Sequence, residues 1–470
     1  MNFTIRNKAK TVFGSKYLFY VLFVIGVFVL AYTIWPKYEA VGFSIYNYRV
    51  TYNFLKLAIG FIFGLVVSYI VYIRYSENTS FSGRVILLIS MLYFIPGIAI
   101  GSALDFEWGY ITCFALYFFV MILADIFISK PKKAPLRIID SQSNVIFFGL
   151  VILSIAYPIV MAAVYNRSFS FSSFLLTISD PYGVRAQSRE QNISWAFLLI
   201  ENWAVYFGAL IITYSLKKKK TILAIIFVLI EAFYFSLQGN RIYVFITGIA
   251  ILLGLIKLND KYLPHIFIGL LLAQIFEFYV FYNIDSLGFV TNVFRRYSIV
   301  PNIISSKYYD YFLSAVPDFL RGHFQNISSL LGTKSPYDFN IGYIVGQKYF
   351  GMNINANTGL VGGAVFEFGV LGVVFDPVML VISFRLFEKV LMDADEEITM
   401  ITALIYASLS INSWAIWSNC IRVSYVPLFI FSLFILVNRT DYKLDQEEIQ
   451  KKKKILFSFG GRRGNNNKNS

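Results

Sequence analysis

The chain has 470 residues, of which 57% are hydrophobic and only 14% are charged, and its mean hydropathy is +0.63. A water-soluble protein of this length needs much more charge on its surface, so the composition excludes a soluble globular protein. Apolar runs of about 17–25 residues, the length that crosses a bilayer, recur along the whole sequence. The sequence therefore predicts an all-α, polytopic integral membrane protein.

The net charge of +14 is concentrated beside the hydrophobic runs, as in the lysine runs Lys217–Lys220 and Lys451–Lys454. Such clusters mark the cytoplasmic ends of membrane spans, so we expect the lipid bilayer as a partner and no nucleic acid. The two cysteines, Cys113 and Cys420, provide neither a disulfide framework nor a metal-binding spacing. Because nucleotide and metal motifs are also missing from the sequence, we expect no cofactor.

The first apolar run, Tyr17–Trp35, is long for a signal-peptide core and ends without a small-residue cleavage site, so we interpret it as a retained span. Hydropathy then predicts about twelve spans. Their approximate ranges are 17–35, 54–73, 84–101, 109–128, 145–164, 195–215, 221–237, 241–257, 264–283, 364–384, 399–416 and 422–437.

An even number of spans places both termini on one side of the membrane. The connecting segments on that side hold the lysine and arginine clusters, which predicts cytoplasmic termini. These segments are 1–16, 74–83, 129–144, 216–220, 258–263, 385–398 and 438–470. We expect one membrane domain, 1–437, followed by a basic cytoplasmic tail, 438–470, that is disordered.

Two long connecting segments, 165–194 and 284–363, fall on the outer side of this topology. Loops longer than about 15 residues are unusual and tend to be functional or disordered. The longer segment is rich in Tyr, Phe, Pro and Gly and mixes both charges. This composition predicts a large folded periplasmic loop with short helices, and 165–194 would be a second periplasmic loop.

Several arginines fall on the outer side, against the usual bias of basic residues toward the cytoplasm. They are Arg167, Arg185, Arg189, Arg241, Arg295, Arg296 and Arg321. Arginine presents a planar fork of donors and stays charged, which suits phosphate and pyrophosphate. Either lipid headgroups or a lipid-linked pyrophosphate substrate would explain these arginines.

Four carboxylates are predicted at one depth, just below the outer surface: Glu201, Glu231, Glu277 and Glu367. Ionisable residues inside spans are costly and are often functional. Each one could instead be a buried partner for a neighbouring helix. Taken together with Arg241, the set favours a site near the outer surface.

His323 lies two residues after Arg321, in the middle of the 284–363 loop. A histidine beside a phosphate-binding arginine can act as a general base. A lone loop histidine is also often an ordinary polar residue, and that interpretation stays open here.

Several motifs between residues 238 and 385 resemble the Wzy family of O-antigen and capsule repeat-unit polymerases. Gly239–Arg241, a tight turn that opens a span, is similar to the Ser/Gly-x-Arg turn of that family. Arg295–Tyr297, with the Tyr-rich stretch Tyr308–Phe312, resembles the start of the family's large periplasmic loop. Asn357–Gly359 and Phe366–Gly372 are similar to the exit of that loop into the next span.

This resemblance implies a GT-C-like, metal-independent glycosyltransferase that polymerises oligosaccharide repeat units carried on undecaprenyl pyrophosphate. The growing chain would leave its carrier and be transferred to a new lipid-linked unit at the periplasmic face of the bacterial inner membrane. The product would be O-antigen or capsule, and a protein that regulates chain length is an implied partner.

Residue roles follow from the same resemblance. Arg241 and Arg321 would be catalytic together with His323, which would orient or deprotonate the acceptor hydroxyl. Arg185, Arg295 and Arg296 would bind the pyrophosphate. Arg241, Arg295, Arg296 and Arg321 would neutralise the negative charge that develops on it as it leaves.

Other functions stay open on the sequence. An O-antigen ligase would have a similar fold and would use the lipid A core as its acceptor. A lipid-linked oligosaccharide flippase also suits about twelve spans, but major-facilitator transporters bind their substrates near the bilayer midplane. Glycosyltransferases that use a polyprenyl-phosphate sugar often carry paired acids in the first outer loop, where 36–53 offers only Glu39.

Overall fold

The computed structural model describes most of the predicted membrane domain. The described residues are 15–38, 46, 48–77, 80–132, 140–164, 174, 177, 184, 195–239, 241–256, 262–281, 288–317, 337, 341–351, 356, 359–412 and 425–438. Every element of regular secondary structure within these ranges is a helix. This confirms the predicted all-α class. Most of 165–194 and nearly all of the 438–470 tail lie outside the described residues.

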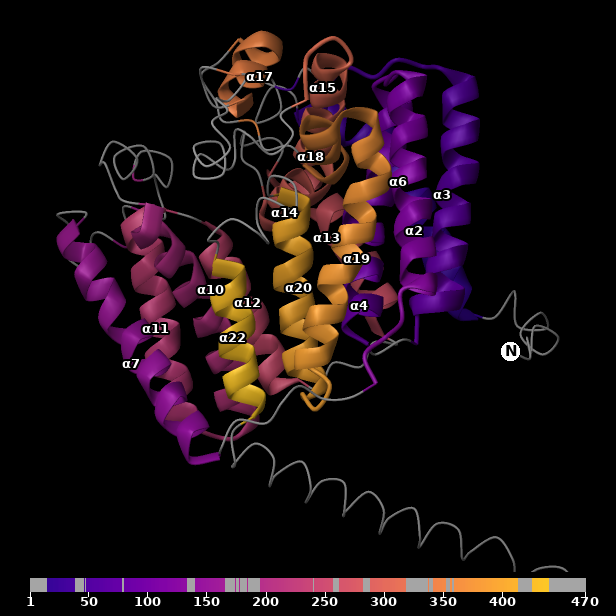
Figure 1. The fold of residues 1–470 in the computed structure, drawn as a ribbon. Helices are drawn as coiled ribbons and strands as arrows, with labels where there is room; N and C mark the ends of the chain where they lie inside the picture. Colours follow the sequence, from indigo (N-terminus) through magenta and orange to yellow (C-terminus); the bar gives the residue numbers. More distant parts are fainter. Residues whose placement is uncertain are drawn as a thin grey trace, which may run out of the picture. The chain divides into compact units, whose positions relative to one another are not determined.

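The helices belong to two compact units, which are described separately (Figure 1). Unit 1 comprises Met1–Lys130, Ile256–Leu386 and Thr399–Ser424. Unit 2 comprises Pro131–Leu255, Phe387–Ile398 and Tyr425–Ser470.

Unit 1 contains most of the described helices, including two π turns, η5 and η8, and most of α19 and α20. They are α2 (Ser15–Thr33), η2 (Trp35–Tyr38), α3 (Phe54–Tyr75), α4 (Phe81–Ile89), η5 (Ser90–Phe94), α5 (Ile95–Ala103), α6 (Trp108–Phe127), α13 (Leu263–Phe281), α14 (Phe289–Phe294), η8 (Arg295–Ile299), α15 (Val300–Phe312), α17 (Ile341–Phe350), α18 (Gly359–Phe368), η9 (Gly369–Leu371), α19 (Gly372–Val390) and α20 (Glu396–Asn412).

Unit 2 is a helical bundle in which α10 packs against each of the other complete helices. These helices are α7 (Asp140–Val164), α10 (Trp195–Lys217), α11 (Thr221–Gln238), α12 (Arg241–Leu255) and α22 (Tyr425–Val437). The indole Nε1 of Trp203 in α10 donates to Ser432 Oγ in α22 at 2.8 Å, which satisfies both buried polar groups.

Eight helical segments among the described residues are long and apolar enough to cross a membrane. They are Lys16–Thr33, Phe54–Tyr75, Phe81–Ala103, Trp108–Phe127, Gln142–Val164, Thr221–Gln238, Leu263–Val280 and Gly359–Val390. Two further apolar helices, Tyr243–Leu255 and Leu428–Val437, are shorter. The chain is thus a multi-pass membrane protein, while the total of about twelve spans and the GT-C-like arrangement remain predictions.

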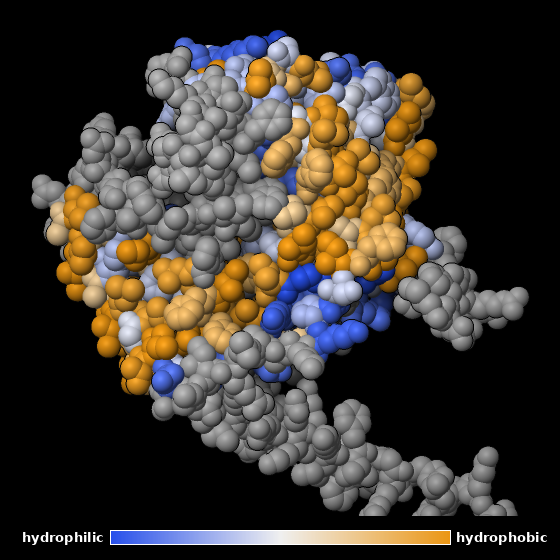
Figure 2. All heavy atoms as spheres, viewed as in Figure 1, coloured by the Kyte–Doolittle hydropathy of each residue, from blue (hydrophilic) through white to orange (hydrophobic). Residues whose placement is uncertain are grey.

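Helix α3 shows how the sequence fits a lipid environment. Its exposed face is a stripe of large apolar side chains spaced by three or four residues, which places them on one side of a helix. The stripe consists of Leu55, Ile59, Ile62, Val66, Tyr69 and Ile73. A helix in water would expose polar residues here, so this face is suited to acyl chains. Hydrophobic residues likewise cover the flanks of the helices in the space-filling view (Figure 2).

The central helix of unit 1 runs without a break through α4, η5 and α5. Of its apolar 18-residue stretch, 94% is buried. It therefore contacts protein rather than lipid. Helix α3 approaches it closely because Gly60 faces Ser102. Ser102 Oγ donates to the carbonyls of Ile98 at 2.9 Å and Lys56 at 3.1 Å, a small polar contact of the kind that joins membrane helices.

The turn between α5 and α6 is tied to the start of α3. Lys56 Nζ lies 2.6 Å from Asp105 Oδ1 and donates to the carbonyl of Phe106 at 2.7 Å. The hydrogen bond from Lys56 holds the pKa of Asp105 below its ordinary value. These contacts place the start of α3, the end of α5 and the start of α6 at one end of unit 1.

A buried ion pair joins helices at the opposite end. Arg385 Nη2 of α19 lies 2.9 Å from Asp125 Oδ1 of α6, and their side chains are only 8% and 1% exposed. Arg385 Nη1 also donates to Ser82 Oγ at 3.0 Å, and the Tyr75 hydroxyl donates to Asp125 Oδ2 at 3.0 Å. The end of α3, the start of α4 and the last turns of α6 and α19 therefore meet at this end.

We predict that Arg385→Met lowers the free energy of unfolding in detergent by up to about 3–5 kcal/mol, because the buried Asp125 then keeps only the more distant and partly exposed Arg74, 3.7 Å from its Oδ2, as a cationic partner. Adding Asp125→Leu should recover part of the loss, since both charges are then removed. The control is Glu77→Gln, which removes one partner of an ion pair whose side chains are 61% and 72% exposed. Equal unfolding midpoints for Arg385→Met and Glu77→Gln would contradict this account.

Candidate functional site

Only part of the predicted site lies within the described residues. Arg295 and Arg296 are on the π turn η8 of unit 1, and the backbone of Arg241 begins α12 of unit 2. The side chain of Arg241, and the whole of Arg185, Arg321 and His323, lie outside the described residues. The catalytic and pyrophosphate-binding set as a whole thus stays a prediction.

The helix that carries the two arginines, Phe289–Phe312, contains the π turn η8 and packs against the π turn η5 of the central helix. A π turn disturbs the regular backbone hydrogen bonds and is often found at functional sites. Here side chains of one helix supply donors to carbonyls of the other: Ser298 Oγ donates to Leu92 at 2.6 Å, and Asn302 Nδ2 to Tyr93 at 3.2 Å. These bonds fix the register of the two helices.

The same contacts set the depth of the arginine turn. Leu92 is the middle residue of the central helix Phe81–Ala103, so Ser298 lies level with the centre of a candidate span. Farther along α15, the ring of Tyr309 packs 5.7 Å from that of Tyr110, near the start of α6. Part of the predicted 284–363 loop therefore lies alongside the central helix, while the placement of the loop on the periplasmic side stays a prediction.

The two arginines differ in exposure. Arg295 is half-buried, and Arg296 is exposed although the next three residues of the turn are buried. Arg385 at the end of α19 is held 2.9 Å from Asp125, whereas Arg296 makes no ion pair with a carboxylate among the described residues. Its guanidinium can therefore bind an anion from outside the chain.

Two glycines between residues 357 and 372, the stretch that resembles the end of the polymerase family's large loop, are required by the backbone. Gly359 begins α18 with φ of +67°, and a Cβ there would lie 2.8 Å from the carbonyl oxygen of Pro301. A Cβ on Gly372 would lie 1.9 Å from the carbonyl oxygen of Ala364, so α18 and α19 can meet only with glycine at this position.

The first turn of α18 is capped by side chains of other helices. The N–H of Gly362 donates to Ser305 Oγ at 2.5 Å, and the N–H of Val361 to the Tyr93 hydroxyl at 3.4 Å. Helix N-termini often bind phosphate through such free N–H groups. Because two of them are already used here, the start of α18 has a structural role.

In unit 2, a chain of hydrogen bonds surrounds the turn that precedes Arg241. Gln238 Nε2 donates to Glu201 Oε2 at 2.6 Å, and the Tyr243 hydroxyl donates to Gln238 Oε1 at 2.8 Å. Gly239 ends α11 in the left-handed conformation, with φ of +65°, so the chain turns directly into α12. The buried carboxylate of Glu201 thus binds the side chain of Gln238, three residues before Arg241.

Glu231 lies two turns earlier on α11 and is only 2% exposed. Gly208 of α10 leaves room for it, because a Cβ there would lie 2.1 Å from Glu231 Oε1. Among the residues that the structure describes, neither carboxyl oxygen has a hydrogen-bond partner. An ionisable group placed this way inside a span is a candidate functional residue.

The other two carboxylates of the predicted outer set are in unit 1. Glu277 accepts hydrogen bonds from the N–H groups of Val290 and Thr291, both at 2.8 Å, and so caps the start of α14. Glu367 is fully buried in α18. Glu277 is therefore a buried partner for a neighbouring helix, which was the alternative to a role in the predicted outer site.

Two acids that are not among the four carboxylates of the predicted outer set lie in buried contacts. Asp125 binds Arg385, and Asp376 Oδ2 accepts a hydrogen bond from the Tyr117 hydroxyl at 2.5 Å. Both acids interrupt apolar runs of the sequence, and this interruption is the only local sign that they have buried partners. Their partners lie about 260 residues away in the chain and are not visible in any local pattern.

Comparisons with known proteins identify no relative: no family model, no curated protein and no solved structure matches this chain. Within the part of the chain that the structure describes, no group of three or more His, Cys, Asp or Glu side chains could hold a metal ion.

We predict that Gly359→Ala destabilises the protein more than Gly351→Ala does. Both glycines have left-handed backbones, with φ of +67° and +64°, so both alanines cost about 1 kcal/mol of backbone strain. A Cβ on Gly351 meets nothing within 4 Å, whereas one on Gly359 meets Pro301. We expect Gly359→Ala to lose about 1–3 kcal/mol more in detergent unfolding. Equal losses would mean that the contact at Pro301 relaxes freely.

Proposed function

We propose that this protein polymerises undecaprenyl-pyrophosphate-linked oligosaccharide repeat units at the periplasmic face of a bacterial inner membrane, for O-antigen or capsule. The observation that carries the proposal is Arg296. Its guanidinium is exposed on a π turn beside the middle of a span, and it has no carboxylate partner among the described residues. A lipid-anchored pyrophosphate is an anion of the right chemistry, and its anchor brings it to the membrane.

The proposed reaction is a transfer between two lipid-linked substrates. The bond between the anomeric carbon of the growing chain and its pyrophosphate oxygen breaks, and a hydroxyl of the new repeat unit forms a bond to that carbon. The pyrophosphate leaves with its negative charge, which arginines at its oxygens stabilise. Arg241, Arg295, Arg296 and Arg321, with Arg185 nearby, are the proposed donors, and His323 is the proposed acceptor of the hydroxyl proton.

The resemblance to the polymerase family supports this proposal unevenly. At Gly359 and in the stretch Phe366–Gly372, the matching glycines are required by the backbone conformation or by close backbone contacts. These matches therefore reflect local folding rather than chemistry. The Arg295–Tyr297 motif is different, because it places an exposed cation at the depth of a span. Cytoplasmic termini and a chain-length regulator as partner belong to the same proposal.

A second function, transport of a lipid-linked oligosaccharide, is favoured by one observation. Glu231 is buried inside a candidate span, and neither of its carboxyl oxygens has a hydrogen-bond partner in the described part of the chain. Carboxyl groups in this situation often carry protons in transporters. A ligase that transfers finished glycan to the lipid A core is the third possibility.

We predict that deletion of the gene reduces surface glycan to core plus a single repeat unit, seen as the loss of the ladder on a gel. Undecaprenyl-linked intermediates should be extracted from the same cells. Long chains that accumulate on undecaprenol without reaching the core would identify a ligase. Lipid-linked units trapped on the cytoplasmic side, with not even a single repeat outside, would identify a flippase.

We predict that Arg296→Ala lowers the rate of polymerisation by about 100-fold or more, because one donor to the leaving pyrophosphate is lost. Arg296→Lys should restore only part of the rate, since lysine lacks the two-pronged geometry. The matched control is Lys130→Gln, which removes an exposed charge from the end of unit 1 where Lys130 contacts Ser80.

The readout is the modal chain length of surface glycan, with membrane insertion checked by immunoblot. Normal chains in an inserted Arg296→Ala variant would remove Arg296 from the site. Arg241→Ala and Arg321→Ala should abolish polymer in the same assay, and normal polymer in both would refute the proposed pyrophosphate clamp.

A further inference from the structure

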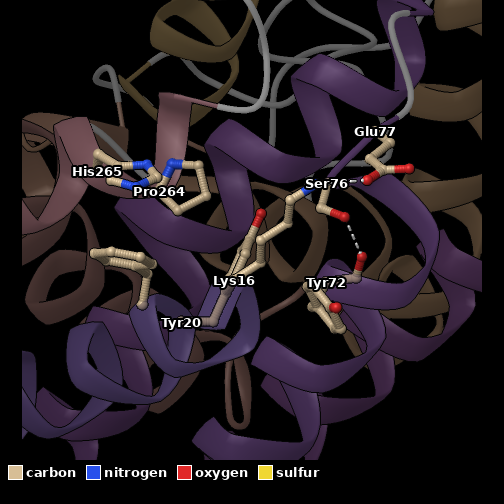
Figure 3. A pocket seen from close by; sticks show the side chains of 8 residues that line it. Lys16, Tyr20, Tyr72, Ser76, Glu77, Pro264 and His265 are labelled. Atoms are coloured by element: carbon tan, nitrogen blue, oxygen red, sulfur yellow. Dashed lines mark hydrogen bonds and ion pairs between the residues drawn. The ribbon is translucent and has the colours of Figure 1, made fainter. Parts of the chain in front are cut away.

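The hollow at the start of α2, the end of α3 and the start of α13 is too small for an organic ligand (Figure 3). Its cavity of about 20 Å³ has room for about one water molecule. In it Lys16 reaches toward Glu77, with Nζ of the lysine 3.0 Å from Oε1 of the acid. A proton, by contrast, needs no cavity, so a buried polar group can bind one where the helices are closely packed.

Two buried carboxyl groups lie along the contact between α10 and α11 in unit 2 (Figure 1). Glu201 of α10 is paired with Gln238, the last residue of α11, whose Nε2 donates to Oε2 of the acid at 2.6 Å. Glu231 of α11 lies against Gly208 of α10, where a Cβ would be 2.1 Å from its Oε1. Residues seven apart recur on one face of a helix, so these four residues form two facing pairs, two turns apart.

The two carboxyl groups have different surroundings. Glu201 accepts the hydrogen bond from Gln238, and Oε1 of Gln238 accepts one from the Tyr243 hydroxyl at 2.8 Å. A donor of this kind stabilises an ionised carboxylate. Glu231 lies next to the middle of the candidate span Thr221–Gln238, and neither of its oxygens has a hydrogen-bond partner among the described residues. An uncompensated charge there is costly, so Glu231 is stable with a proton bound.

Tyr234 supplies a hydroxyl close to both carboxyl groups. It lies three residues after Glu231 on the same face of α11, and its hydroxyl interacts electrostatically with Glu231, Glu201 and Tyr157 of α7. Its ring packs 6.5 Å from that of Tyr243 in α12. The described titratable groups that α7, α10 and α12 bring to this place are thus a carboxyl and two phenols, with no cation among them. The Tyr234 hydroxyl is buried and makes no hydrogen bond with a described residue, so it is available to accept and donate a proton.

We propose that Glu231 is a proton-binding site inside the membrane and is filled through Glu201 and Tyr234. The Glu201 proton moves to the Tyr234 oxygen while the Tyr234 hydroxyl proton moves to the Glu231 carboxylate, so one proton is transferred and the tyrosine is restored. Because Glu201 pairs with the last residue of α11, protons enter at the end of the span that turns into α12, the periplasmic end on the predicted topology. Carboxyl relays of this kind link membrane proteins to the proton gradient.

The first test is carbodiimide labelling of the full-length protein in detergent at about pH 7, where an ordinary glutamate is ionised. The apolar reagent dicyclohexylcarbodiimide reacts with a protonated carboxyl: a carboxyl oxygen bonds to the central carbon of the reagent, and the carboxyl proton moves to its nitrogen. The matched control is Glu277, which is also buried in a candidate span but accepts two backbone N–H groups. Mass spectrometry of peptides should find at least about tenfold more adduct on Glu231 than on Glu277.

The second test follows the bound proton by infrared spectroscopy, which detects the C=O stretch of a protonated carboxyl and its shift when heavy water replaces the proton by deuterium. Glu231→Gln should remove this band, because the amide has no carboxyl proton. Tyr234→Phe should slow the exchange about tenfold or more, because the hydroxyl that passes the proton is lost. Tyr110→Phe, which removes a buried hydroxyl from unit 1, should leave the exchange rate unchanged.

The proposal is overturned if Glu231 is labelled no more than Glu277, or if Glu231→Gln keeps the whole infrared band, since either result means that Glu231 carries no proton. Exchange in Tyr234→Phe at the rate of the unaltered protein overturns the proposed path. A merely structural Tyr234 would not change this rate. None of these measurements depends on glycan chain length, so they succeed or fail independently of the proposed polymerisation.

Discussion

The contact between Ser298 and the carbonyl of Leu92 fixes the arrangement on which the rest of unit 1 depends. Inside a membrane, every backbone carbonyl needs a donor from the protein, and π turns disturb the regular supply. Ser298 and Asn302 provide donors to the central helix at its π turn. Once this register is set, Ser305 lies beside Tyr93 and caps α18, so the α14–α15 helix, α18 and the central helix form one hydrogen-bonded core.

The position of the turn that carries Arg295 and Arg296 depends on that core. The Tyr297 hydroxyl shares a hydrogen bond of 2.9 Å with Ser408 of α20, which holds the middle of the turn. The ring of Phe294, just before the turn, packs 6.1 Å from that of Trp35. A rigid turn means that the backbone of Arg296 loses little freedom when the guanidinium binds an anion, and this pre-organisation of the backbone strengthens binding. The proposed clamp therefore depends on buried polar contacts several residues away from Arg296.

The sequence predicted the membrane class well, because lipid contact leaves a local pattern such as the apolar stripe from Leu55 to Ile73 on α3. It also drew attention to Arg295 and Arg296. The sequence did not predict that Phe289–Phe312 packs beside the central helix. Polar residues such as Asn302 and Ser305 are typical of a loop, and only their hydrogen-bond partners in the structure show that they are buried in a helix. The role of Glu277 as a helix cap and the pairing of Asp125 with Arg385 depend on distant residues in the same way.

The depth of Arg296 has one further consequence. A charged side chain that faces acyl chains near the centre of a bilayer is costly, by about 2.5–3.5 kcal/mol even on permissive scales. Arg296 is exposed and lies two residues before Ser298, which touches the middle of a span. On the proposed function, the space in front of its guanidinium would hold water or an anion rather than lipid. A water-filled approach from the membrane surface to Arg296 is what a lipid-linked pyrophosphate needs, because its charged group can enter while its polyprenyl chain stays in the bilayer.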